Sequence, residues 1–109
     1  MRAVLYARVS TEEQGNKGYS LRQQLEVLRE YCQQNEYKIV GEFEDRSSGA
    51  SLDRPGLDAL RDAVSAGGVD VVLAQDLDRF ARKPDDYFLL LKEFEEHGTK
   101  IRAINDRDA

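Results

Sequence analysis

Several arginines and a serine stand where predicted strands end, and together they have the chemistry of a phosphate site. Each guanidinium group offers a planar fork that matches phosphate oxygens, and it stays charged at any working pH. Several such groups can neutralise the charge that develops on a phosphodiester under attack, and a serine hydroxyl can supply the nucleophile. The set therefore indicates phosphoryl transfer. Its members are Arg8, Ser10, Arg54, Arg79 and Arg82.

Further polar residues accompany this set. Gln14 follows the first predicted strand with Ser10, and Asp45 follows the second. Asp78 precedes Arg82 by four positions, so a helix over this segment would place the two side chains on one face. The general base is not identified, because His97 is the only histidine and it lies at the end of a predicted helix.

The pattern along the chain alternates apolar runs typical of strands with helical periodicity. We expect strands at 3–8, 38–43, 69–74 and 100–104, and helices that begin at Ser20, Pro55 and Pro84. Helical crossovers between successive strands imply an α/β fold of three layers, with a mainly parallel sheet of about four strands and helices on both faces. Ligands of such sheets bind outside the carboxyl ends of the strands, which is where the arginines and the serine stand.

Apolar stripes indicate which helix faces are buried. In the first helix the stripe is Leu21, Leu25, Leu28 and Cys32, and in the second it is Leu57, Leu60 and Val64. Ser20 and Gln23 have the spacing of a capping box. In the third helix we expect the apolar group to form core and a subunit contact; its members are Leu89, Leu90, Leu91 and Phe94.

Composition limits the function classes. A chain of 109 residues is sufficient for one domain. Its net charge of -5 argues against a freestanding DNA-binding module, which would be basic. The single Cys32 cannot form an internal disulfide, which fits a cytoplasmic location. No apolar run approaches the length that spans a membrane, so we expect no membrane contact.

Four segments resemble the serine site-specific recombinases of the resolvase/invertase family, in that family's order and spacing. They are YARVSTEEQ (6–14), GYSLRQQ (18–24), EDRSSGASLDRPGL (44–57) and LDRFAR (77–82). The resemblance covers essentially the whole chain. The SLRQQ and LDRPGL runs look more like the large serine integrases and transposases than the small resolvases.

The resemblance implies a role for each matching residue. Ser10 would attack the DNA backbone to form a 5′-phosphoserine and release a 3′ hydroxyl, without a metal or another cofactor. Asp78 would hold the phosphate-binding arginines in place. Supporting positions would be Gln14, Gln24 and Asp45, and the phosphate-binding arginines would be Arg8, Arg54, Arg79 and Arg82. Some small members of the family carry a basic residue where this chain has Ala63.

The resemblance also implies partners and a larger protein. Family members act on double-stranded DNA at specific attachment sites and associate into dimers and tetramers. They continue with a long dimerisation helix and a separate DNA-binding region, so residues 1–109 are expected to be a catalytic-domain fragment, inactive alone. Two alternatives stay open: a non-catalytic protein-interaction domain, and a phosphate-binding or receiver-like α/β domain. The first would not need Ser10 and the arginines, and the second would favour a glycine-rich loop or an acidic cluster after the first strand.

Overall fold

The computed structural model describes residues 1–9, 20–46, 54–81 and 83–105. Strands and helices alternate along these residues, as the apolar pattern predicts. The helices are α1 (Leu21–Gln34), α2 (Pro55–Ser65) and α3 (Pro84–Glu95), with a short 3-10 turn, η1 (Leu77–Arg79). The strands are β1 (Arg2–Val9), β2 (Lys38–Arg46), β3 (Val71–Ala74) and β4 (Lys100–Ala103).

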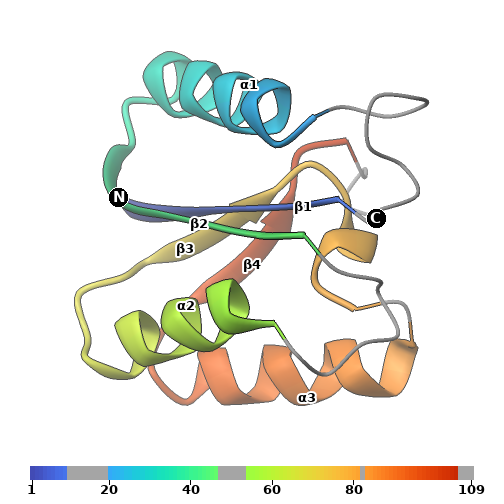
Figure 1. Ribbon diagram of the computed structural model, residues 1–109. Coiled ribbons are helices and arrows are strands. Elements are labelled where there is room, and N and C mark those ends of the chain that lie inside the picture. Colours follow the sequence, from blue (N-terminus) through green and yellow to red (C-terminus); the bar gives the residue numbers. More distant parts are fainter. Residues whose placement is uncertain (10–19, 47–53, 82, 106–109) are drawn as a thin grey trace.

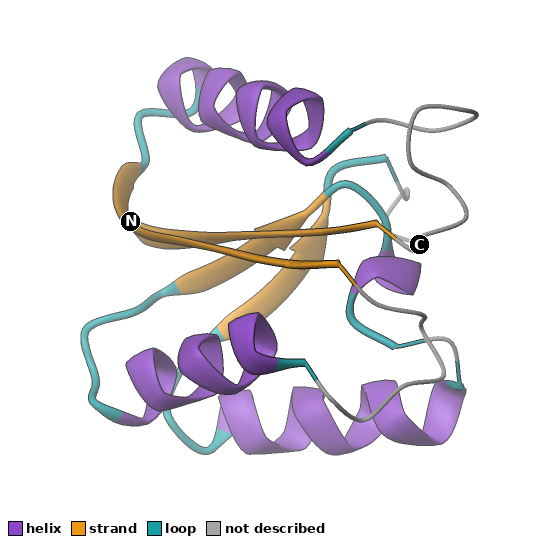
Figure 2. Ribbon diagram, viewed as in Figure 1, coloured by secondary structure: helices purple, strands orange, loops and turns teal. Residues whose placement is uncertain are grey.

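All strand pairs of the sheet are parallel, in the order β2-β1-β3-β4. Helix α1 covers one face, and α2 and α3 cover the other (Figures 1 and 2). The predicted three-layer α/β fold is confirmed. Because the chain moves from β1 to β2 in one direction and then to β3 and β4 in the other, the order reverses between β1 and β3, which is where such sheets bind ligands.

Two apolar clusters fill the two sides of the sheet. Ala3, Leu5, Ala7 and Val9 of β1 face α1, whereas Val4 and Tyr6 face α2 and α3. This alternation follows from the two-residue period of a strand. The predicted stripes of α1 and α2 are buried as expected, and Ser20 forms the predicted capping box with Gln23. Burial raises the pKa of the Cys32 thiol, which fits a core residue rather than a reactive one.

The elements differ from the predicted ones in their bounds, and three differences concern residues singled out in the sequence. Strand β2 extends to Arg46, so Asp45 lies within the strand rather than after it. The segment containing Asp78 forms a single 3-10 turn, so the condition for Asp78 and Arg82 to share a helix face, a helix over this segment, is not met. In α3, Leu90 and Phe94 face the core, whereas Leu89 lies on another side of the helix and is exposed. None of the helices among the described residues is long and apolar enough to cross a membrane.

The lengths of the strands create the space for a site. Strand β1 pairs with β2 as far as Val9, but it pairs with β3 only as far as Leu5. The last residues of β1 therefore extend beyond β3 on that side. Turn η1, which follows β3, contacts this part of β1. The carboxyl ends of β1 and β3 thus meet η1 and the beginnings of α1 and α2.

Candidate functional site

Three of the predicted arginines lie together at this edge of the sheet. Arg8 comes from the end of β1, Arg54 is the N-cap residue of α2, and Arg79 ends η1. Arg8 is 2% exposed and Arg54 is 6% exposed. Arginines this deeply buried are uncommon, because removing a charge from water is costly unless other polar groups replace the water. Their burial therefore requires polar groups of the protein around them in place of water.

Backbone carbonyl groups of the η1 region provide much of that environment. Arg8 donates from Nε to the Arg79 carbonyl at 3.0 Å and from Nη2 to the Asp78 carbonyl at 2.8 Å. Arg54 donates to the carbonyl groups of Phe80 and Arg79. Carbonyl oxygens carry only partial charges, so these bonds position the guanidinium groups without cancelling their positive charge. Arg54 Nε is buried and has no hydrogen-bond partner among the described residues.

Tyr6 links Arg54 to Asp45 and was not predicted as a site residue. Its hydroxyl donates to Asp45 Oδ2 at 2.6 Å and accepts from Arg54 Nη2 at 2.9 Å. The Arg54 guanidinium also lies 5.6 Å from the centre of the Tyr6 ring, and the Tyr6 ring stacks with the ring of Phe80. The sequence supported only a packing role for Tyr6, because its strand position shows burial but not what its hydroxyl meets.

The environment of Tyr6 makes it unsuitable as a nucleophile. The side chain is fully buried, and burial together with the hydrogen bond to Asp45 holds the pKa of its hydroxyl well above its ordinary value. Tyr6 is therefore neutral in the folded protein. Because its folded-state pKa is raised, its contribution to stability is present below the ordinary pKa of about 10 and is lost as the pH rises beyond it.

We expect Tyr6→Phe to destabilise the domain by about 1–3 kcal/mol, because it leaves polar groups of Asp45 and Arg54 buried without the hydroxyl that joins them. Urea unfolding measures this change. The matched control is Tyr31→Phe, which removes an exposed hydroxyl held by Arg102 at 3.4 Å and should cost less than about 0.5 kcal/mol. Equal effects of the two substitutions would contradict the structural role given to Tyr6.

Gln24 holds the end of β1 from the neighbouring helix. Its Oε1 accepts from the Arg8 backbone N–H at 3.2 Å, and its Nε2 donates to the Arg8 carbonyl at 3.1 Å. The fully buried amide thus takes the place of a strand partner beyond the point where β3 stops pairing. These two hydrogen bonds of Gln24 hold the backbone of Arg8 in place. Arg79 Nη1 also donates to the Arg8 carbonyl, at 3.1 Å.

The predicted acidic residues differ in what they contact. The side chain of Asp78 is exposed, whereas its backbone carbonyl accepts the hydrogen bond from Arg8 Nη2. Among the described residues, the carboxylate nearest to Arg79 in an ion pair belongs to Asp76, at 3.7 Å. Ser10, Gln14 and Arg82 lie outside the described residues; in the sequence Ser10 directly follows the last residue of β1, Val9.

Asp45 also caps helix α2 from outside the helix. Its Oδ1 accepts from the Gly56 N–H at 2.7 Å, and its Oδ2 accepts from the Leu57 N–H at 2.8 Å. These N–H groups belong to the first turn, which has no partners within the helix and attracts negative charge. Asp45 is therefore a structural anion that orients α2 and, through Tyr6, its N-cap residue Arg54.

We expect Gly56→Ala to destabilise the domain by at least about 2 kcal/mol, because overpacking against backbone cannot be relieved by a side-chain rotation. A β-carbon at this position would lie 2.1 Å from the Glu44 carbonyl oxygen. Thermal or urea unfolding measures the loss. Gly41→Ala is the control, since its β-carbon would first meet the Phe43 ring at 3.1 Å, and that ring can move. A Gly56→Ala protein as stable as the control would contradict this close packing.

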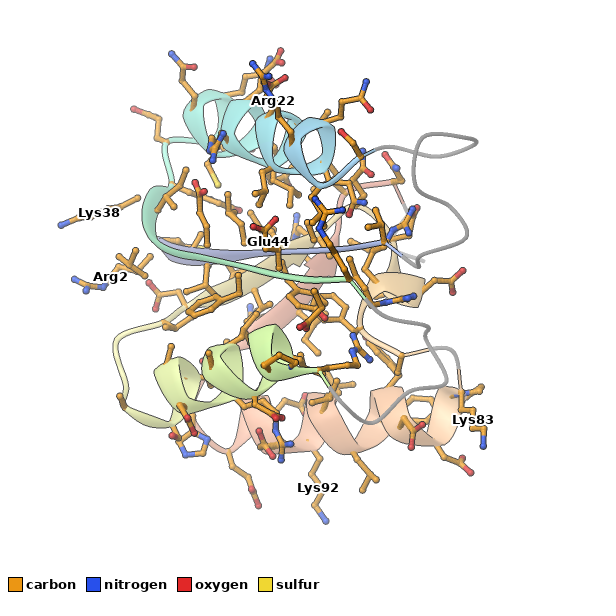
Figure 3. All side chains as sticks on the ribbon, viewed as in Figure 1. Arg2, Arg22, Lys38, Glu44, Lys83 and Lys92 are labelled. Atoms are coloured by element: carbon orange, nitrogen blue, oxygen red, sulfur yellow. The ribbon has the colours of Figure 1, made fainter. Side chains whose placement is uncertain are left out.

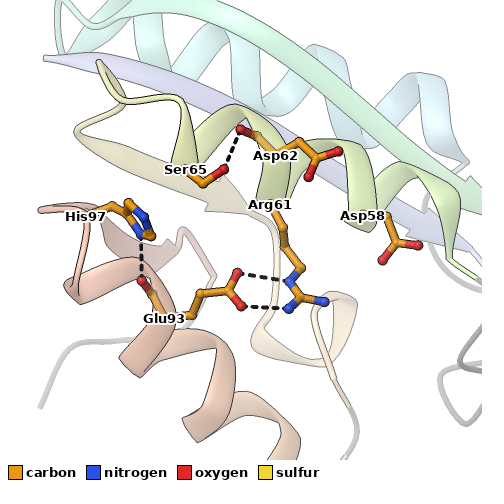
Figure 4. Close-up of a pocket in the computed structure, with 6 residues that line it drawn as sticks. All are labelled: Asp58, Arg61, Asp62, Ser65, Glu93 and His97. Carbon is orange, nitrogen blue, oxygen red and sulfur yellow. Dashed lines mark hydrogen bonds and ion pairs between the residues drawn. The ribbon is translucent and has the colours of Figure 1, made fainter.

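A separate pocket lies between α2, where its lining runs from Asp58 to Ser65, and the C-terminal part of α3; none of the clustered arginines lines it. Figure 4 shows Arg61 and Glu93 joined across it by two hydrogen bonds, and His97 beside the Glu93 carbonyl. Asp58 and Asp62 add negative charge. This lining does not suit phosphate, so the arginine cluster remains the candidate site for an anionic substrate.

Known proteins with a similar sequence identify the family of this chain. Residues 3–109 match the family model described as the resolvase N-terminal domain. The chain belongs to the resolvase family. Curated relatives of this family include the transposon Tn3 resolvase of Escherichia coli, which is 42% identical over 106 residues. That match covers 97% of this chain and 51% of the relative, so the chain spans about half the length of that resolvase.

Solved structures of serine recombinases have the same fold. The catalytic domain of ISC1926 TnpA, an IS607-like serine recombinase, is 34% identical with a TM-score of 0.85, over 98% of this chain and 72% of that one. The catalytic domain of TP901-1 integrase also has a TM-score of 0.85, with 27% identity over 96% of this chain and 78% of that one. The predicted family is thus confirmed, and the chain has the fold of these serine recombinase catalytic domains. Resolvases, an IS607-like serine recombinase and an integrase are all among its similar proteins.

Proposed function

We propose that this chain is the catalytic part of a site-specific DNA recombinase in which Ser10 attacks the DNA backbone. Arg8, Arg54, Arg79 and Arg82 would bind the phosphate under attack, and Gln14, Gln24, Asp45 and Asp78 would support them. The observation that carries the proposal is the buried arginine cluster at the end of β1, since Ser10 is the next residue after that strand.

The proposed reaction is a transesterification. The Ser10 hydroxyl oxygen forms a bond to phosphorus, the bond from phosphorus to the 3′ oxygen breaks, and a 3′ hydroxyl leaves while the 5′ phosphate stays on the serine. A 3′ hydroxyl of a recombining strand then attacks the phosphoserine and restores a phosphodiester. One ester replaces another at each step, so no nucleotide hydrolysis is needed to drive the exchange.

The anchored guanidinium groups suit this chemistry. A fixed array of charged donors stabilises developing negative charge without reorganising at the moment of reaction. The carbonyl contacts of Arg8 and Arg54 fix their side chains, and Gln24 and Tyr6 hold the segments that carry them. The same residues would serve a phosphate-binding domain without catalysis, but family membership favours the recombinase.

We further propose that the chain acts within a longer protein that binds double-stranded DNA at specific attachment sites and associates into dimers and tetramers. The related Tn3 resolvase is about twice as long as the region that this chain matches. The rest of such a protein would supply most of the DNA affinity. We expect the protein in the cytoplasm, because its proposed substrate is DNA and its single cysteine, Cys32, cannot form an internal disulfide.

A chimera tests the proposed function without knowledge of the natural site. Residues 1–109 replace the matching half of Tn3 resolvase, and the chimera is assayed on DNA carrying the sites of that resolvase. We expect cleavage and recombination that persist in excess chelator. A folded chimera that binds these sites but never cleaves them, while unmodified Tn3 resolvase does, would contradict a catalytic role and favour a binding domain.

We expect the chain alone to bind DNA weakly, because its net charge of -5 opposes the phosphate attraction that dominates non-specific binding. Fluorescence anisotropy with labelled duplex DNA at about 0.1 M salt should give a dissociation constant no tighter than about 10⁻⁴ M. The chimera, which contains the DNA-binding half of Tn3 resolvase, is the positive control. Tight, salt-dependent and sequence-specific binding by the chain alone would show that the main DNA-binding elements lie within it.

A further inference from the structure

The Arg79 guanidinium lies between a buried partner and a partner at the surface. Surface cations such as Lys83 and Lys92 point away from the body of the domain in Figure 3, where water surrounds their charges. The Arg79 side chain, in contrast, is 11% exposed. Its Nη1 donates to the carbonyl of the buried Arg8 at 3.1 Å, and its Nη2 lies 3.7 Å from Oδ2 of Asp76. Two arms of one guanidinium thus meet two different kinds of partner.

The Asp76 carboxylate stands on the solvent side of this pair and is held there loosely. Its side chain is 35% exposed, about three times as much as that of Arg79. Asp76 is the N-cap residue of η1, but its side chain makes no capping hydrogen bond. Charge-assisted hydrogen bonds between guanidinium and carboxylate groups span about 2.7–2.9 Å, so a contact at 3.7 Å is held by charge rather than by close hydrogen bonding. A rotation of the Asp76 side chain is sufficient to break it.

Asp45, the other carboxylate beside the arginine cluster, is fixed in place. It accepts hydrogen bonds from the Tyr6 hydroxyl and from the N–H groups of Gly56 and Leu57, at 2.6 to 2.8 Å. Displacement of Asp45 would therefore leave buried donors without a partner, which is costly. Asp76 has no comparable set of bonds to lose, so of these two carboxylates it is the one that an incoming anion can replace.

We propose that, in the DNA-free protein, the Asp76 carboxylate occupies the position on Arg79 that the phosphate under attack takes when DNA binds. The carboxylate offsets part of the mutual repulsion of the clustered arginines while no substrate is present. An oxygen of the DNA phosphate then replaces Oδ2 of Asp76 beside Nη2, and Asp76 turns toward solvent. The inference rests on the proposed function in naming DNA as the source of that phosphate.

This exchange makes the site selective against free anions. A free phosphate ion has to displace Asp76 with no other interaction to support it. A phosphodiester that the rest of a longer protein holds beside the site binds in an intramolecular step, at an effective concentration that a free ion lacks. Asp76 is thus a specificity-determining residue, since it lowers the affinity of Arg79 for every anion and only tethered DNA overcomes the competition.

The opposite role for Asp76 predicts effects of opposite sign. If Asp76 oriented Arg79 for catalysis, as a positioning residue, its loss would weaken phosphate binding and slow DNA cleavage. If it competes with phosphate, its loss strengthens phosphate binding and does not slow cleavage. Asp76→Asn separates the two roles, because it removes the charge and keeps the shape of the side chain. Asp76→Glu keeps the charge and should therefore behave like the unaltered chain.

Titration of the chain with inorganic phosphate, followed through the Arg79 Nε–H signal in proton–nitrogen NMR spectra, tests the competition without DNA. Phosphate is raised from about 1 mM to about 100 mM, the range of weak binding, at constant ionic strength. Asp76→Asn should lower the phosphate dissociation constant at least about fourfold, the effect of removing one like charge about 5 Å away in water. Asp86→Asn is the matched control, since it makes the same change of charge on the exposed first turn of α3 and should leave the dissociation constant unchanged.

In the Tn3 chimera, with DNA in excess, Asp76→Asn should cleave at least as fast as the unmodified chimera and up to about fourfold faster. Urea unfolding establishes that each variant is folded. Phosphate binding that Asp76→Asn leaves unchanged or weakens, equal tightening by Asp86→Asn, or slower cleavage by a folded Asp76→Asn chimera would each overturn the proposal. Tighter phosphate binding by Asp76→Asn, in a chimera that never cleaves with or without the substitution, would support the competition and contradict the catalytic function instead.

Discussion

Ser10→Ala in the Tn3 chimera is expected to lower the rate of DNA cleavage at least about 10⁴-fold, with binding to the sites nearly unchanged. The hydroxyl oxygen is the proposed attacking atom, and removal of an enzyme's nucleophile costs several orders of magnitude. Binding energy would come mainly from the DNA-binding half of the chimera. Cleavage of labelled site DNA, followed by gel electrophoresis under denaturing conditions, measures the rate.

Ser65→Ala is the matched control for this substitution. Its hydroxyl is exposed and donates to the Asp62 carbonyl at the end of α2, away from the arginine cluster. The control chimera should cleave DNA at the rate of the unmodified chimera. If Ser10→Ala retained cleavage at a rate close to the control, another group would have to be the nucleophile.

Arg8→Ala is expected to lower the cleavage rate about a hundredfold to a thousandfold, as removal of one preorganised donor does in other active sites. Arg8→Lys should restore little of this loss. The Arg8 guanidinium is positioned by two carbonyl groups through two different nitrogens, at 3.0 and 2.8 Å, and a single ammonium group cannot reproduce that fork. Single-turnover cleavage with site DNA in excess of its dissociation constant isolates the chemical step.

Arg29→Ala serves as the control for loss of an arginine. Arg29 forms a bidentate ion pair with Glu42 on the surface, at 2.7 and 2.6 Å, and lies outside the arginine cluster. Exposed pairs of this kind contribute little to stability, so this variant should cleave normally. Unfolding experiments on the Arg8 variants separate a lost charge from a damaged fold. A folded Arg8→Ala protein with normal cleavage would remove Arg8 from the proposed machinery.

The sheet and its helices were predictable because local pattern and global packing agree. The β-branched run that contains β3 is buried on both faces, and the stripe of α2 faces the core at Leu57, Leu60 and Val64. Helical crossovers make the strands parallel, so their carboxyl ends, with Arg8, Arg54 and Arg79, share one edge of the sheet. The order of the strands was not predicted. Local signals were weaker at the ends of elements, so the extension of β2 through Asp45 was missed.

The hydrogen-bond partners within the site could not be predicted, because they depend on contacts between residues far apart in the chain. Tyr6 meets Asp45 and Arg54 across 39 and 48 positions, respectively. Among the described residues, Arg79 pairs with Asp76, the N-cap residue of a 3-10 turn that the sequence did not predict. The roles of Ser10, Gln14 and Arg82 stay predictions, since these residues lie outside the described ones.

The most direct test of the central claim is to identify the residue that becomes covalently attached to DNA. The chimera is incubated with a suicide substrate whose nick prevents religation, and the trapped protein is digested and analysed by mass spectrometry. The account predicts a 5′ phosphate esterified to Ser10, and the same adduct in the presence of chelator. An adduct on another residue, such as Tyr19, or efficient cleavage with no adduct at all would contradict it.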